Sequence, residues 1–531
     1  MKRLIVCLLL LAMMLSLSGC SLLFDFQMPK VTLPELEPTG ESTVPTTQPV
    51  QVEEEGLQPL ALCVGGEFLG EWTDNYIPLA RVSWEDVILS TASAEKFPAL
   101  AHALETIRVE TAAWAEDTLQ MMLPDAEAVA DYMGEDFYGF YHDTEVIVQR
   151  ADEKILSLRY ESGGYTGGAR PYYTIGMRNL DPVTGQVIPL DRVVTDWNRL
   201  PKLLEKALLE KYPELEIGAF DDIETMLESY PMEAYCWTMD YQGISFYFGM
   251  AEIAPAVAGV LSATLWFDQY PDLFVGDFLD MPPQGYGKGL SPSYETDVDL
   301  DRDGIRDSVY AYVDHQGALH IDKNDQTLVN DQVYGYENGT EAYLVTPDNE
   351  RFYLYVETGS DNDYNTLWVY DLSGEGIRLV TSLPGEGFAG YWEAEEALSM
   401  LLYPVLNDPT GFELATRVDM LGTISGRRGY SMDPKTGAPV PKEGYYTLDG
   451  ENRPPLVTKI TVKAKSLPWK RDIEIPAGTQ LWFLRTDQES YVDMRMADGT
   501  QCRIYVTRQN WQCYVNDLPE TECFDGILYA G

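Results

Sequence analysis

The segment DVDLDRDGIRD, residues 297–307, places an aspartate at every second position and then a glycine. Oxygen ligands at this spacing converge on one cation as the chain curls, as in the loop of an EF-hand. Gly304 takes the position at which such a loop turns sharply through a conformation that glycine tolerates. The pattern predicts a structural calcium ion with five ligand residues, one of which contributes its backbone carbonyl: Asp299, Asp301, Asp303, Ile305 and Asp307.

The loop differs from an EF-hand at its end. Tyr310 stands where the bidentate glutamate would be, and the next residues alternate like a strand and not like a helix. The loop therefore resembles the calcium turns of FG-GAP-type β-propeller blades. Without the bidentate ligand we expect an affinity of roughly 10⁻⁴–10⁻³ M, which is adequate only outside the cell. A hairpin rich in aspartate and glycine that binds no metal is the alternative.

The N-terminus has the pattern of a secretory signal. Two basic residues precede an apolar run over residues 4–17, which is too short for an ordinary membrane-spanning helix. The sequence LSGC, residues 17–20, resembles a bacterial lipobox. This resemblance implies cleavage before Cys20, lipidation of its thiol, and anchoring to the outer face of the cell membrane. A plain signal peptide with an incidental cysteine, or an uncleaved anchor, is the alternative.

The chain is strongly acidic. It has 37 basic and 85 acidic residues, a net charge of −48, and loss of residues 1–19 removes two basic residues, so that 35 − 85 = −50. Such a surface repels nucleic acid and anionic membranes and attracts divalent cations or cationic proteins. We therefore expect no nucleic-acid partner. Acidity that serves solubility alone is the other reading of this charge.

Composition divides the chain into a signal peptide (1–19), a lipidated cysteine with a tether rich in proline, threonine and glutamate (20–56), and three folded parts. Residues 57–285 mix helical and strand patterns and predict an α+β domain. Residues 286–455 contain hairpins and predict a propeller-blade-like or sandwich-like β region. Residues 456–531 contain short strands and predict a small SH3-like barrel. The expected fold is multidomain, first α+β and then mostly β.

Three segments of the α+β part have helical spacing. Residues 97–114 have Pro98 at the start and place four apolar residues on one face: Leu100, Leu104, Ile107 and Trp114. Residues 200–213 repeat this pattern, and residues 221–230 begin with the spacing of a capping box. Strands are expected at residues 154–162, 172–180 and 243–250.

Three motifs of the α+β part resemble a known domain family. They are GGA at residues 167–169, DPVTG at 181–185 and AEIAPAVAG at 251–259. Similar motifs occur in the domains of RsiV-type anti-sigma factors and in the extracytoplasmic part of a peptidoglycan deacetylase. The resemblance covers roughly residues 75–275. It implies a surface-exposed ligand-binding domain, whose ligand in RsiV-type proteins is lysozyme, with these binding residues: Gly167, Gly168, Arg170 and Pro255.

Two residues depart from the family pattern. Arg170 stands where the family often has histidine, and Ala256 stands where it often has tyrosine. The chain also has no cytoplasmic anti-sigma region or spanning helix, so signalling by regulated proteolysis does not carry over. We expect a binding or sensing protein whose partner is a cell-wall component such as peptidoglycan, or a secreted protein such as a cationic, lysozyme-like hydrolase.

The sequence offers little to an enzyme. Its four histidines fit no zinc-hydrolase motif, and neither a G-x-S-x-G elbow nor a Cys/His zinc spacing occurs. We therefore expect a protein without enzymatic activity. The alternative is a cell-wall-modifying hydrolase with a pair of catalytic carboxylates, which the sequence does not single out among 85 acidic residues. Cys502 and Cys513 could form a disulfide in the last part.

Overall fold

The computed structural model describes residues 56–529, except residues 74, 135–136, 169, 214–222, 334, 337–339, 361–363, 389–390, 396–397, 451–452 and 511. The predicted signal peptide, Cys20 and the predicted tether up to residue 55 lie outside these residues. The chain forms an α+β part followed by mostly β sheets, which confirms the predicted fold class. Within the described residues, no helix combines the length and the apolar character needed to cross a membrane.

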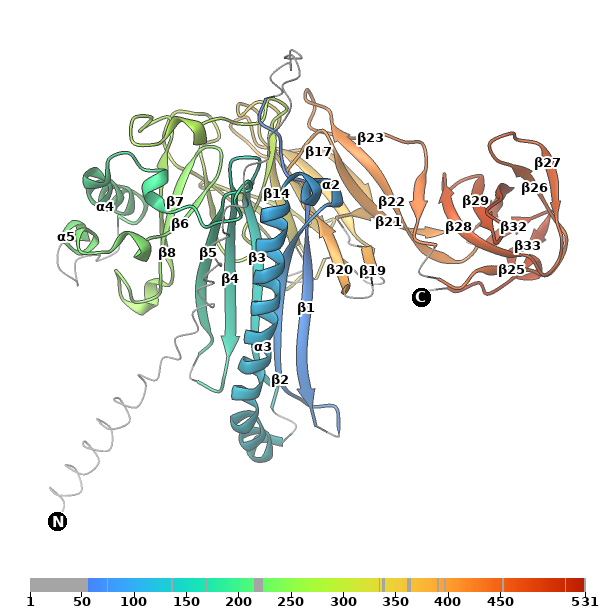
Figure 1. Ribbon diagram of the computed structural model, residues 1–531, viewed down its shortest axis with the longest axis horizontal. Helices are drawn as coiled ribbons and strands as arrows, with labels where there is room; N and C mark the ends of the chain where they lie inside the picture. Colours follow the sequence, from blue (N-terminus) through green and yellow to red (C-terminus); the bar gives the residue numbers. More distant parts are fainter. Residues whose placement is uncertain are drawn as a thin grey trace, which may run out of the picture.

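A seven-stranded sheet forms the centre of the α+β part (Figure 1). Its strands in spatial order are β19 (Tyr391–Glu395), β20 (Leu398–Pro404), β1 (Leu62–Trp72), β2 (Pro78–Leu89), β3 (Phe140–Ala151), β4 (Leu156–Tyr165) and β5 (Tyr172–Leu180). Strands β4 and β5 confirm two predicted strands. Strands β19 and β20 come from the predicted β region, so this sheet joins segments that are far apart in the sequence.

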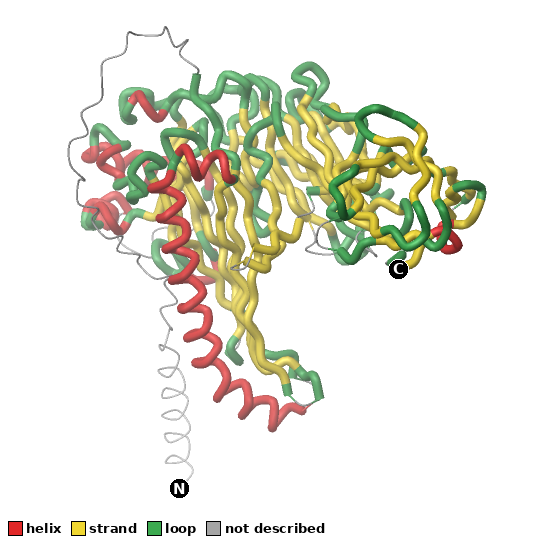
Figure 2. The backbone as a smooth tube through the Cα atoms, turned by 45° about the vertical axis from the view of Figure 1, so that its right-hand side comes forward, coloured by secondary structure: helices red, strands yellow, loops and turns green. Residues whose placement is uncertain are grey.

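A helical crossover covers one face of this sheet. Strands β2 and β3 are parallel neighbours, and a parallel pair needs a long connection, which α2 (Thr91–Lys96) and α3 (Pro98–Met133) provide. Helix α3 begins at Pro98 as predicted and runs along the sheet toward the tip of the β1–β2 hairpin (Figures 1 and 2). Of its predicted inner residues, Leu100, Leu104 and Ile107 are buried, and Trp114 is half-buried.

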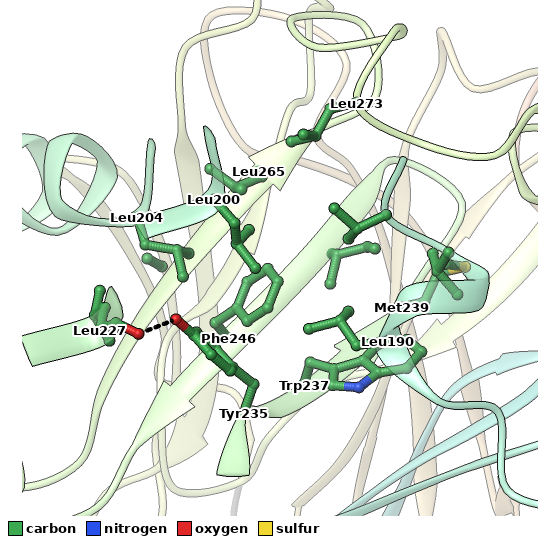
Figure 3. Close-up of a cluster of buried hydrophobic side chains, with 14 of the residues drawn as sticks. Leu190, Leu200, Leu204, Leu227, Tyr235, Trp237, Met239, Phe246, Leu265 and Leu273 are labelled. Atoms are coloured by element: carbon green, nitrogen blue, oxygen red, sulfur yellow. Dashed lines mark hydrogen bonds between the residues drawn. The ribbon is translucent and has the colours of Figure 1, made fainter. Parts of the chain in front are cut away.

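A second layer contains the other predicted helices. A small antiparallel sheet consists of β6 (Cys236–Met239), β7 (Gly243–Phe248) and β8 (Leu261–Trp266). Two helices share its hydrophobic core: α4 (Leu200–Lys211) and α5 (Ile223–Glu228). Their buried side chains form one core, in which the Tyr235 hydroxyl donates to the Leu227 carbonyl at 2.7 Å (Figure 3). The start of the predicted capping box, Asp221, lies outside the described residues. Short 3-10 helices are η2 (Leu190–Arg192), η3 (Trp197–Arg199), η5 (Met232–Ala234), η6 (Ala256–Ala258) and η7 (Gly276–Phe278).

The β region contains two antiparallel sheets. One has the order β10 (Thr296–Val298), β11 (Asp307–Val313), β12 (Leu319–Lys323), β13 (Gln326–Asn330). The other has the order β17 (Arg378–Pro384), β16 (Thr366–Asp371), β15 (Tyr353–Thr358), β14 (Thr340–Thr346), β9 (Tyr286–Gly289). Buried residues of both sheets, such as Ile321 and Leu354, share one hydrophobic core. This shared core matches the sandwich-like alternative.

The C-terminal strands do not close into a barrel, so the predicted SH3-like barrel is wrong. Their main sheet has the order β18 (Glu386–Gly387), β21 (Phe412–Asp419), β22 (Thr423–Met432), β24 (Tyr446–Leu448), β28 (Gln480–Thr486), β29 (Tyr491–Met496), β30 (Gln501–Tyr505), β26 (Val462–Ser466), β27 (Asp472–Ile475). Strand β28 pairs with β24 and thus with strands before residue 455, and so the sheet continues and stays open. Also present are β23 (Pro439–Pro441), β25 (Leu456–Thr458), β31 (Thr507–Gln509), β32 (Gln512–Val515), β33 (Leu518–Pro519), β34 (Phe524–Asp525) and α6 (Glu520–Cys523).

The possible disulfide in this part is not formed. Cys502 and Cys513 are both buried and carry no S–S bond. Both side chains lie in the apolar core of the C-terminal strands, where they pack as small hydrophobic groups.

Candidate functional site

The acidic loop connects β10 to β11, which pair with Val298 opposite Asp307. The loop turns through two residues with positive φ, Arg302 at 60° and Gly304 at 78°. Gly304 therefore occupies the left-handed conformation that its position in a calcium loop requires. The predicted turn geometry is present, and the predicted strand follows the loop as β11.

Three carboxylates of this loop lie close together. Asp299, Asp301 and Asp307 each offer one oxygen, and these oxygens lie within 4.8 Å of one another. Asp299 is the deepest, with 3% of its surface exposed. Its Oδ2 accepts a hydrogen bond from the Gly304 N–H at 3.0 Å, whereas its buried Oδ1 has no hydrogen-bond partner among the residues that the structure describes. Since an unpaired buried carboxylate oxygen is costly, the arrangement fits a bound cation.

The surroundings of Asp299 favour a neutral or metal-bound carboxyl group. Burial raises its pKa, and the negative charges of Asp303 and Asp301 raise it further, against the lowering effect of backbone N–H donors. A divalent cation would offset both effects. Asp307 is held in place by the Leu300 N–H at 2.8 Å and by the Asn324 side-chain amide at 2.5 Å.

The other two predicted ligands are placed differently. Asp303 is exposed, does not belong to the group of three carboxylates, and accepts a hydrogen bond from the Ile305 N–H at 2.7 Å. The Ile305 side chain is 68% exposed. Calcium takes six to eight oxygen ligands, so carbonyl groups and water would complete a site built on the three carboxylates.

Side chains of the α+β part hold the loop. The Gln242 amide nitrogen donates to the Asp299 carbonyl at 2.7 Å, and its oxygen accepts from the Asp299 N–H at 3.2 Å. The Gln269 amide donates to the Gly304 carbonyl. Arg302 pairs with Asp268 at 2.7 Å. The loop is therefore a junction between the α+β part and the β region, and a cation there would stabilise the junction.

The predicted binding residues of the glycine-rich loop lie at the end of the β4–β5 hairpin. Gly167, Gly168 and Arg170 are exposed, and Ala169 lies outside the described residues. Gly167 has a φ of 84°, and a Cβ atom there would come within 2.9 Å of the Phe140 ring. This position requires glycine because of both conformation and space.

Pro255 lies in another loop, between β7 and β8. It is exposed and directly precedes η6, and Gly259 with a φ of 72° ends this short helix. Pro255 thus shapes a surface loop. Whether the two loops share a ligand stays a prediction.

His142 is a buried histidine near the glycine-rich loop. Its Nδ1 lies 2.7 Å from the Tyr172 hydroxyl, and its Nε2 lies 3.1 Å from the Thr144 hydroxyl. Burial lowers its pKa to about 4. The ring is therefore neutral at physiological pH and serves as a packed, hydrogen-bonded core residue.

The structure also brings together three carboxyl groups that the sequence could not single out. Glu341 and Glu357 stand directly opposite each other on β14 and β15. Burial raises the pKa of Glu341 to about 8, and the charge of Glu357 adds to the rise. Burial raises the pKa of Glu357 to about 7. It raises the pKa of Glu85 on β2 to about 8, and the charges of Glu145 and Glu341 contribute. The proximity of these three carboxyl groups arises only in the folded chain, and no spacing along the sequence indicates it.

Comparisons with known proteins gave few matches. No protein-family model and no curated protein matches the chain. A solved structure of a DUF3298 family member from Bacteroides fragilis is 17% identical and covers 42% of this chain and 95% of its own, with a TM-score of 0.29. A DUF3298 family protein from Pseudomonas aeruginosa is 13% identical and covers 42% of this chain and 98% of its own, with a TM-score of 0.27. The aligned region is the N-terminal part. At these values the likeness carries no argument about activity.

Proposed function

We propose that the chain is a lipid-anchored, extracytoplasmic binding protein in which calcium stabilises the junction between the α+β part and the β region. The observation that carries the proposal is the buried, unpaired Oδ1 of Asp299 beside the carboxylates of Asp301 and Asp307. A buried charge without a partner destabilises a fold unless a cation or a proton neutralises it.

The extracytoplasmic location is inferred from the low calcium affinity expected of the site. Three clustered carboxylates without a bidentate glutamate suit the millimolar calcium found outside cells. The lipobox-like sequence at Cys20 and the preceding apolar run support the same location. The RsiV-like motifs and the FG-GAP-like loop are consistent with this setting.

The partner is a cell-wall component or a cationic secreted protein. The net charge of −50 after loss of residues 1–19 favours a cationic hydrolase such as lysozyme through electrostatic attraction. The exposed loop with Gly167, Gly168 and Arg170, together with Pro255, is the contact surface that the family resemblance implies.

Retention experiments test this function. Soluble protein beginning at Ser21 is passed over purified peptidoglycan and over immobilised lysozyme, with millimolar calcium or with a chelator. Retention on one matrix that calcium strengthens is the expected result. Passage through both columns under all conditions would rule out the binding role. Arg170→Ala is the informative variant, and Arg192→Ala, an exposed arginine elsewhere on the same part, is its control.

A hydrolase that uses carboxylates is the second candidate, and the cluster of Glu85, Glu341 and Glu357 favours it. Carboxyl groups that hold a proton near neutral pH can act as general acids. Release of reducing sugars or amines from cell walls by the wild type, and its loss in Glu341→Gln, would establish this activity. Equal release by both proteins, or none by either, would remove it.

A further inference from the structure

The C-terminal part of the chain differs in charge from all that precedes it. Residues 456–531 carry nine basic and ten acidic residues, a net charge of −1. Residues 20–455 carry the remaining 26 basic and 75 acidic residues, a net charge of −49. A polyanion is repelled by the larger part and meets little repulsion from residues 456–531. A binding surface for a polyanion would therefore have to lie here.

A row of charged side chains crosses one face of the C-terminal sheet. The register places Lys465 on β26 opposite Arg503 on β30, Arg503 opposite Asp493 on β29, and Asp493 opposite Arg485 on β28. Lys465 in turn stands opposite Asp472 on β27 and pairs with it at 2.7 Å. Three cations and two anions on five adjacent strands therefore leave a net charge of +1 along the row. Neighbouring strands are about 4.8 Å apart, so the positive charges are closely spaced.

The buried acid of this row, Asp493, orients the two arginines. Asp493 is fully buried and accepts hydrogen bonds from Arg503 Nε at 2.6 Å, Arg503 Nη2 at 2.8 Å and Arg485 Nε at 2.7 Å. The side chains of Arg485, Arg503 and Lys465 keep 37%, 21% and 34% of their surface exposed. Asp493 thus fixes the guanidinium groups on the sheet without covering them.

Aromatic rings lie between the cations. The Arg503 guanidinium lies 3.4 Å from the centroid of the Tyr491 ring, and Arg495 lies 5.7 Å from that of Trp482. Tyr505, opposite Tyr491 in the register, is 50% exposed. The residues of opposite parity on these strands point into the hydrophobic core, which identifies this face as the outer one: Val492, Met494, Cys502 and Ile504.

We infer that this surface binds a linear phosphodiester-linked sugar polymer of the cell wall. We call it the cationic face, defined by these residues: Lys465, Arg485, Arg495 and Arg503 with Tyr491, Tyr505 and Trp482. Guanidinium groups held in a fixed plane suit phosphodiester oxygens, and flat rings beside them pack against the apolar faces of sugars. The choice of a wall polymer rests on the proposed extracytoplasmic location.

Binding of a defined polymer tests the inference. The probe is poly(glycerol phosphate) bearing sugar substituents, and the comparison probes are dextran and single-stranded DNA of equal charge. Protein beginning at Ser21 should bind the phosphodiester polymer at low salt, and raised salt should weaken the binding steeply. Dextran should bind weakly because it has no charge, and DNA should bind more weakly than the sugar polymer.

Two substitutions at partly exposed residues test the cationic face. Lys465→Ala should weaken binding about 3- to 10-fold and reduce its salt dependence, because one phosphate contact is lost. Tyr505→Ala should weaken it about 2- to 10-fold with unchanged salt dependence. Lys202→Ala, an exposed lysine on α4, is the matched control and should change nothing. Circular dichroism checks the fold of each variant.

Three outcomes overturn the inference. They are no binding of the phosphodiester polymer by the wild type, equal binding by the wild type and both rim variants, and binding of DNA as tight as that of the sugar polymer. Calcium binding at Asp299 and retention on peptidoglycan or lysozyme are measured separately. Loss of polymer binding would therefore leave the proposed function standing. Absence of calcium binding, or of retention on peptidoglycan and lysozyme, would leave the polymer-binding result at the cationic face unaffected.

Discussion

Glu85→Gln should make the protein more stable at neutral pH and less sensitive to pH. Burial raises the pKa of Glu85 from 4.5 to about 8, and the charges of Glu145 and Glu341 contribute to the rise. The folded chain therefore keeps a proton on Glu85 that the unfolded chain loses. Stability from this proton is complete below pH 4.5 and is lost as the pH rises through 8. Glutamine mimics the protonated group, and its carbonyl oxygen can still accept from the Val146 N–H, which lies 2.7 Å from Glu85 Oε2.

The size of the effect follows from the pKa. A rise from 4.5 to about 8 corresponds to roughly 5 kcal/mol at 1.36 kcal/mol for each pKa unit, and this is an upper bound because Glu85 keeps partial exposure. We expect Glu85→Gln to raise the free energy of unfolding by about 2–5 kcal/mol at pH 8 and by little at pH 4.

Urea unfolding followed by tryptophan fluorescence at pH 4, 6 and 8 measures this difference. Glu71→Gln, at an exposed glutamate of β1, is the control and should behave like the wild type at each pH. The reasoning is refuted if Glu85→Gln loses stability between pH 4 and 8 as steeply as the wild type does.

Three further predictions concern other parts of the chain. Gly304→Ala forces a side chain into a φ of 78° and should destabilise the protein by about 1–3 kcal/mol in thermal unfolding, with weaker calcium binding; an unchanged midpoint would contradict the strain. Cys20→Ala should abolish incorporation of labelled palmitate and leave an unprocessed precursor, whereas continued labelling would disprove lipidation at this thiol. Arg150→Met removes the ion-pair partner of the buried Asp152, now at 2.6 Å, and should lower the free energy of unfolding in urea by about 3–5 kcal/mol. Lys96→Met, which removes an exposed ion pair, should lower it by less than about 1 kcal/mol. Equal effects of the two substitutions would refute the difference between buried and exposed pairs.

Periodic patterns made much of the fold predictable. The start and the inner face of α3 were predictable from Pro98 and from the apolar spacing of Leu100, Leu104 and Ile107. This spacing reflects the period of 3.6 residues per helical turn, which is visible within a short stretch of sequence. The hairpin of β14 and β15 was predictable for the same reason, since its strands alternate around a short turn.

Pairing between distant strands was not predictable from local patterns. Nothing near Leu398 indicates that β20 pairs with β1, more than 300 residues earlier in the chain. The prediction of an SH3-like barrel was wrong for the same reason, because β28 pairs with β24 and the C-terminal sheet stays open. Such contacts depend on the whole topology and not on the residues of one strand.

The candidate site was predictable in position but not in its members. The alternation of aspartates identified the loop, and the glycine requirement placed its turn at Gly304. Which carboxylates converge depends on how the loop lies against Gln242 and Gln269, and these contacts leave Asp303 outside the cluster. The carboxyl cluster around Glu341 was hidden for a related reason, since its members come from distant strands.

Calorimetric calcium titration of the protein beginning at Ser21, beside Asp299→Asn and Asp303→Asn, tests the central claim most directly. The wild type should bind with a dissociation constant of roughly 10⁻⁴–10⁻³ M, and a tenfold excess of calcium over this constant should stabilise the fold by about 1.4 kcal/mol. Asp299→Asn should give no heat of binding, whereas Asp303→Asn, outside the cluster, should retain most of it. Equal heats from all three proteins would contradict a calcium site built on Asp299.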